Sequence, residues 1–305
     1  MASINFMADL QEIIIRRLSN LGPLPTPGED LDTLLIRYLN LIRRMPPVIC
    51  WNIKQSKDLI SKSLSEEIHN GLQQFIEKAE SGQDLKPHIS TRINNPDYND
   101  TMFSDWGFFH FHLGTTLDPD PRRYGFIQRT NELLFAILAP NSETMYLIDV
   151  HPHTGGFINQ DLLRIIEENW EELLDPHTVR GIDEIDYNPS DNDIGIFRKA
   201  GLVTISQTPG GRILFPMGGG NTTAGTYNKK RTDGTSVKDR EDADKIISRV
   251  RELENWFIQQ RNTLASEFKN TYSKEWDDLH FKIISFEKPA EIKELITGHI
   301  LFVSS

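Results

Sequence analysis

The chain has 305 residues, a formal net charge of −11 at pH 7 and a single cysteine, Cys50. One cysteine excludes an internal disulfide and a zinc site built from cysteines, and it suits a reducing compartment. The acidic balance argues against a broad basic surface for duplex nucleic acid, but it is compatible with a small local basic site. No segment approaches the roughly 18 apolar residues of a membrane span, and the first residues lack a secretory pattern. We therefore expect a cytoplasmic protein without a membrane partner.

Residues 1–98 are predicted to form a helical N-terminal region. Apolar residues recur at helical spacing over 10–18 and again over 31–42, with a break rich in proline and glycine between them. A third helix is predicted over 56–79. The polar, turn-rich stretch 80–104 that follows is typical of a connection or a domain boundary.

Residues 99–235 are predicted to hold a central antiparallel sheet. Phe108–Leu113 and Met145–His151 alternate between apolar and polar positions, and Leu133–Leu138 is a continuous apolar run. Their short connections indicate a three-stranded meander, with a helix after it that packs on the sheet. Residues 236–305 are predicted to form a long amphipathic helix, then a strand and a final short helix and strand. The expected fold class is α+β.

Two His-x-His pairs lie on this predicted sheet. His110 and His112 are two residues apart in a strand, so they point to the same face. The strand that ends at His151 lies two strands away, at about 10 Å for a spacing of ~4.8 Å per strand. Alternation places Asp149 on the same face as His151, whereas Pro152 interrupts the pattern and leaves the direction of His153 open.

Three interpretations of the histidines follow from their chemistry. The first is a metal-independent site that cleaves RNA through its own 2′-hydroxyl, which needs a base, an acid and a cation. Imidazoles suit the first two roles and Arg129 suits the third. The second is a hydrolase or oxygenase that holds one divalent transition metal ion. Its ligands would come from His110, His112, Asp149, His151 and His153. The third is a structural role on a half-buried sheet.

The strands also carry a resemblance to a known family. The order FFHFHLG, Arg129, ELLFAIL and MYLIDVHPH resembles the RelE/HigB group of ribonuclease toxins over residues 105–155. That group belongs with barnase and the colicin-type ribonucleases, and its members cleave RNA without a metal. The resemblance implies an endoribonuclease of toxin or phage-defence type, with RNA as substrate and a cognate antitoxin as a partner. It makes His110, His112, Arg129 and His151 the candidate catalytic residues, although such toxins usually carry arginine or lysine where this chain has histidine.

The glycine-rich segment 218–235 is a weaker candidate. GNTTAGTY has the glycine spacing of a phosphate-binding loop, but Thr226 stands where that motif requires lysine. Lys229, Lys230 and Arg231 form the densest basic cluster and are candidate substrate-binding residues; the alternative is a solvated loop. The leading hypothesis is thus an endoribonuclease without a cofactor. A metal-dependent enzyme and a non-enzymatic acidic interaction or immunity-type protein are the alternatives.

Overall fold

A computed structural model describes residues 4–22, 28–182, 185–203, 205–222 and 235–304. The chain forms two compact units, Met1–Leu39 with Asp239–Ser305, and Asn40–Lys238. This division differs from the expected segments 1–98, 99–235 and 236–305. The reason is that the two ends of the chain pack together: the Ile283 amide donates to the Asp9 carboxylate at 3.0 Å.

The first unit combines helices with a small antiparallel sheet. Its helices are α1 (Phe6–Leu21), the first part of α2 (Leu31–Arg43), most of α9 (Val237–Gln259), α10 (Arg261–Tyr272) and the short η7 (Trp276–Asp278). Its strands are β9 (Phe281–Ser285), β10 (Ala290–Glu294) and β11 (Ile300–Val303), in the order β11-β10-β9. The predicted long helix is confirmed in α9. The predicted final helix is wrong, because the chain after β9 forms two strands.

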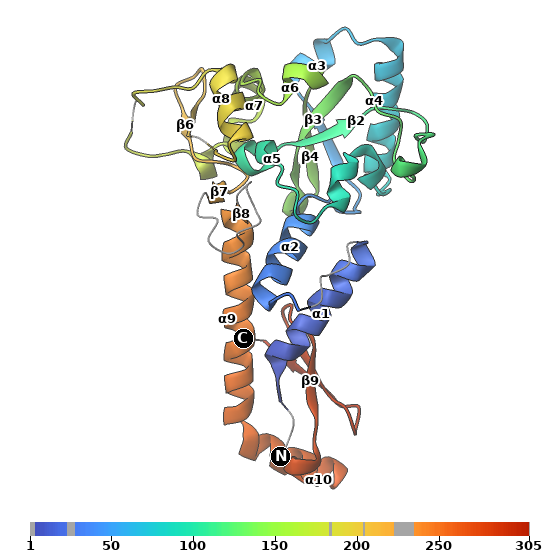
Figure 1. The fold of residues 1–305 in the computed structure, drawn as a ribbon, viewed down its shortest axis with the longest axis vertical. Coiled ribbons are helices and arrows are strands. Elements are labelled where there is room, and N and C mark those ends of the chain that lie inside the picture. Colours follow the sequence, from blue (N-terminus) through green and yellow to red (C-terminus); the bar gives the residue numbers. More distant parts are fainter. Residues whose placement is uncertain (1–3, 23–27, 183–184, 204, 223–234, 305) are drawn as a thin grey trace. The chain divides into compact units, whose positions relative to one another are not determined.

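The second unit is built on a four-stranded sheet in the order β1-β4-β3-β2. Figure 1 labels β2, β3 and β4 of this sheet. The strands are β1 (Asn52–Gln55), β2 (Phe109–His112), β3 (Glu132–Ala139) and β4 (Thr144–Pro152). The last three form the predicted antiparallel meander. β1 pairs in parallel with β4 and lies in the region predicted to be helical. Its sequence, NIKQ, is short and mostly polar, so it carries no alternation that would indicate a strand.

A register shift in β4 changes which side chains share a face. Phe135 pairs with Asp149 and Ala136 pairs with Leu147, so Ile148 is an extra residue between the two pairs. The predicted strict alternation along β4 is therefore wrong. Such an extra residue is a β-bulge, which changes the direction of the side chains around it. Ile148 packs in the same apolar cluster as Phe135.

Helices cover both faces of this sheet, and Figure 1 shows α4 and α7 on opposite sides of it. On α4 (Glu66–Glu80), Phe75 packs on Phe111 of β2 with ring centroids 4.7 Å apart. α4 lies so close that a Cβ at Gly71 would stand 1.8 Å from the Leu113 carbonyl oxygen. On α7 (Asp161–Trp170), Leu162, Leu163 and Ile166 join the cluster around Leu133 and Phe135.

Shorter elements complete the second unit. The predicted helix 56–79 is split into α3 (Lys57–Ser61) and α4, because Ser65 caps a new helix start. The others are η1 (Lys86–His88), η2 (Thr91–Asn94), α5 (Thr101–Trp106), η3 (Pro121–Arg123), η4 (Pro140–Ser142), α6 (His153–Gly156), η5 (Glu171–Leu173), η6 (Asp175–His177), α8 (Asp191–Lys199), and the two-residue strands β5 (Ser206–Gln207), β6 (Ile213–Leu214), β7 (Asn221–Thr222) and β8 (Thr235–Ser236). None of the described helices is long and apolar enough to span a membrane.

Candidate functional site

A cavity of about 380 Å³ lies in the second unit, beside β2. Pockets for small molecules and nucleotides typically measure about 300–1,000 Å³, so this one has room for a ligand the size of one nucleotide. Its wall comes from η2, α5, β2, α6 and α8 and from the segments next to them. The histidines and cationic side chains of the wall are His110, His112, His153, Arg92, Arg129, Arg198 and Lys199.

The cavity collects three of the four candidate catalytic residues, His110, His112 and Arg129. It adds His153, whose direction the sequence left open. Pro152 is the last residue of β4 and α6 begins at His153, so the chain leaves the sheet at this point. The His153 amide donates to the Asn131 carbonyl at 2.7 Å, which holds the turn against the start of β3.

His151 is not among the residues that line the cavity. Leu133 of β3 pairs with His112 on one side and with His151 on the other, so a full strand separates the two imidazoles. The His151 Nε2 atom lies 2.8 Å from Asp149 Oδ2, and Lys62 Nζ lies 2.6 Å from the same oxygen. Burial raises the pKa of Asp149, but its hydrogen bonds to His151, Lys62 and the Val150 amide outweigh burial and hold the pKa below its usual value. His151 thus belongs to a separate ion network.

The residues proposed as ligands of one metal ion do not converge. Asp149 and His151 lie beyond Phe135 and Leu133, which separate them from His110 and His112. In the part of the chain that the structure describes, no three or more histidine, cysteine, aspartate or glutamate side chains group closely enough to hold a metal ion. The geometry does not support the set His110, His112, Asp149, His151 and His153.

The environment of His112 fixes its protonation. The Thr130 amide donates to His112 Nδ1 at 3.3 Å, so the neutral ring carries its proton on Nε2. Burial, reinforced by neighbouring His110 and the charge of Arg129, lowers the pKa of His112 to about 3. At neutral pH the side chain is therefore an uncharged hydrogen-bond donor, and its Nδ1 is unavailable as a base.

His110 sits in a half-buried aromatic environment. Its ring meets Phe157 edge-on, with centroids 4.8 Å apart, and Phe157 also contacts His153 at 5.1 Å. Burial lowers the pKa of His110, while the carboxylate of Asp100 opposes that shift. We expect a neutral imidazole at pH 7, which is the form that accepts a proton.

The positive charges of the wall differ in their partners. Arg198 is buried, lies over the Trp106 ring at 4.0 Å, and holds the Asp105 carboxylate through Nε at 3.0 Å and Nη2 at 2.7 Å. Arg129 and Lys199 are exposed and form no hydrogen bond or ion pair with other described residues. These two cations line the cavity together with neutral His110 and His112, so the cavity favours an anionic ligand.

A second buried histidine supports the end of β2. His88 Nδ1 lies 2.9 Å from the His112 carbonyl oxygen, and Lys78 Nζ lies 3.1 Å from His88 Nε2. A carbonyl only accepts and an ammonium only donates, so His88 is neutral with its proton on Nδ1. Burial and the Lys78 charge lower the pKa of His88 to about 4.

The stability of the fold is expected to fall as the pH drops below about 6.5. In the unfolded chain both histidines have a pKa near 6.5, whereas in the folded chain the pKa is about 4 for His88 and about 3 for His112. The unfolded state then binds more protons, and each histidine removes about 1.4 kcal/mol of unfolding free energy per pH unit. Urea unfolding at pH 7 and pH 5 measures this loss. In His88→Gln the loss should be smaller than in the wild type by the contribution of one histidine, and an unchanged loss would contradict the assignment.

Comparisons with known proteins gave no counterpart. No family model, curated protein or solved structure matches the chain. The resemblance to the RelE/HigB group therefore remains a prediction.

Sequence reasoning missed several residues of the cavity. Arg92 and Asp100 lie in the stretch 80–104, which was predicted to be a connection or a domain boundary, and Arg198 and Lys199 lie in the last turn of a helix that follows an acidic loop. Of these residues, Asp100 alone carries a recognisable local pattern, because it caps the start of α5. The predicted substrate-binding cluster Lys229, Lys230 and Arg231 lies outside the described residues, as does most of GNTTAGTY.

Proposed function

We propose that the protein is an endoribonuclease that cleaves single-stranded RNA in this cavity without a metal. The observation that supports this proposal most strongly is that one cavity of nucleotide size is lined by His110, His112, His153 and the unpaired Arg129. Cleavage through the 2′-hydroxyl requires a proton acceptor, a proton donor and positive charge near the phosphate, and these groups provide all three.

The roles follow from protonation and exposure. Neutral His110 removes the 2′-hydroxyl proton, and the 2′-oxygen then attacks phosphorus. The bond between phosphorus and the 5′-oxygen breaks, and His153, which is exposed at the cavity, donates a proton to that leaving oxygen. His112 Nε2–H and Arg129 stabilise the phosphorane charge. His151, the fourth candidate from the sequence, has no role in this assignment because it does not line the cavity.

Burial of the reacting groups favours a single-stranded substrate. His112 is 5% exposed, so a phosphate held inside a duplex does not reach it. An unstacked nucleotide enters such a cavity readily, and most sequence-specific RNA recognition uses unpaired bases for this reason. A toxin or phage-defence role and a cognate antitoxin remain part of the proposal and are supported by the resemblance alone.

The test is the chemistry of the product ends. Purified protein is incubated with an unstructured RNA in excess EDTA, and the ends are identified by mass spectrometry. We expect 2′,3′-cyclic phosphate and 5′-hydroxyl ends, and no cleavage where the nucleotide before the scissile bond is 2′-deoxy. Intact RNA, or fragments ending in 3′-hydroxyl, would contradict the proposal.

Arg129→Ala is expected to weaken RNA binding by about 10- to 100-fold, because a charge-assisted contact to phosphate contributes roughly 1.5–3 kcal/mol. The slope of the logarithm of affinity against the logarithm of salt concentration should become smaller by about one, since one fewer phosphate is neutralised. Arg122→Ala is the matched control: its side chain is 89% exposed on the same loop and is paired with Asp120. Fluorescence anisotropy with 2′-O-methyl RNA measures the affinity of both variants, and equal affinities would contradict a contact between Arg129 and the phosphate.

A further inference from the structure

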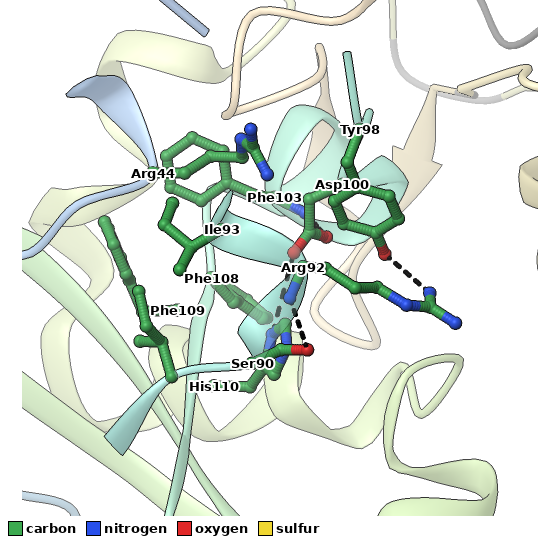
Figure 2. A pocket seen from close by; sticks show the side chains of 11 residues that line it. Arg44, Ser90, Arg92, Ile93, Tyr98, Asp100, Phe103, Phe108, Phe109 and His110 are labelled. Atoms are coloured by element: carbon green, nitrogen blue, oxygen red, sulfur yellow. Dashed lines mark hydrogen bonds and ion pairs between the residues drawn. The ribbon is translucent and has the colours of Figure 1, made fainter. Parts of the chain in front are cut away.

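A second, smaller cavity adjoins the site. It measures about 30 Å³ and is lined by Ser90, Asp100 and His110, which also line the large cavity. Figure 2 shows the Asp100 carboxylate directed toward the His110 ring across this space. A site of this volume holds one water molecule when two to four polar groups face it.

The Nδ1 atom of His110 requires a hydrogen-bond partner at this small cavity. His110 Nδ1 is buried and has no hydrogen-bond partner among the described residues. It lies 3.9 Å from Asp100 Oδ2, which is too long for a direct hydrogen bond and short enough for a bridge through one water. A buried ring nitrogen without a partner is costly, so a bridge here is favoured.

We infer that Asp100 is the positioning residue of His110, and that one water in the small cavity joins its carboxylate to the Nδ1–H of the imidazole. With its proton held on Nδ1, His110 presents a bare Nε2 as the base. The catalytic meaning of this arrangement rests on the proposed function, whereas the tautomer itself does not.

Local structure holds the Asp100 carboxylate still. Asp100 caps α5, and its Oδ1 accepts a hydrogen bond from the Phe103 amide at 3.0 Å, which leaves Oδ2 for His110. The titratable groups that act on His110 are Asp100, Arg92 on η2, His153 on α6 and its strand neighbour His112. Asp100 is the anion among them, so it alone favours a proton on Nδ1.

The experiment is ¹⁵N NMR of labelled histidine side chains, which reports the protonated nitrogen without any RNA. In the wild type His110 is expected to carry its proton on Nδ1. Asp100→Asn retains the helix cap, since asparagine caps as well as aspartate, and it should shift the proton toward Nε2. The cleavage rate at pH 7 should fall about tenfold with KM unchanged, equivalent to about one pKa unit at the base.

Glu80→Gln, on the exposed side of α4, removes the same charge and should change neither property. A wild-type proton on His110 Nε2, or an unchanged tautomer in Asp100→Asn, would overturn the inference. If Asp100→Asn fails to fold, Asp100→Ser repeats the test, because serine also caps a helix. An Nδ1 tautomer in a protein that does not cleave RNA would refute the function and leave this positioning intact.

Discussion

His110→Ala should lower the rate of RNA cleavage by about 10²- to 10⁴-fold, the usual contribution of a general base. The ring of His110 combines a neutral form at pH 7 with a place in the cavity beside Arg129. His112 does not replace the lost ring, because its Nδ1 already accepts from the Thr130 amide, and His153 serves as the acid in the same reaction. Single-turnover rates with excess protein measure the chemical step.

The control for that variant is His69→Ala, which removes an exposed imidazole from α4. Both variants should retain the wild-type circular dichroism spectrum, and His69→Ala should also retain the wild-type rate. If His110→Ala cleaves as fast as His69→Ala, the base lies elsewhere.

Arg198→Ala is expected to lower the unfolding free energy by about 3–5 kcal/mol, because it leaves the Asp105 carboxylate buried without its main partner. The Arg198 and Asp105 side chains are 6% and 1% exposed, so water replaces little of the lost interaction. The variant also removes packing on Trp106. Urea unfolding measures the change.

A double variant separates the charge from the packing. Arg198→Met with Asp105→Leu removes both charges and keeps apolar volume, so it should recover most of the loss, as replacements of buried ion pairs often do. A single variant that loses less than about 1 kcal/mol, or a double variant that is no better than the single one, would contradict a buried charge as the cause.

The periodicity of apolar residues correctly predicted the strands β2, β3 and β4 of the second unit. Alternation at Phe108–Leu113 placed His110 and His112 on one face, and both line the same cavity. Short polar segments gave no such signal, so β1 was missed because NIKQ has one apolar residue. The bulge at Ile148 also escaped, because register depends on the partner strand rather than on the pattern of β4.

The candidate site was predictable only in part, because some of its residues are brought together by packing between distant segments. Sequence spacing correctly paired His110 with His112, but the choice between His151 and His153 depends on where Pro152 ends β4. Arg92 and Asp100 reach the cavity through the turns between α4 and β2, a path that no spacing rule reveals. Long-range approach of this kind is set by packing and is not encoded in a local motif.

Histidine NMR detects RNA binding in the cavity of the second unit through the imidazoles that line it. A 2′-O-methyl RNA trinucleotide, which is not cleaved, is titrated into the protein while the imidazole signals are followed. We predict that the signals of His110, His112 and His153 shift together with one affinity, while those of His69 and His151 stay in place. Shifts confined to His69 or His151, or no shift at millimolar RNA, would contradict the account.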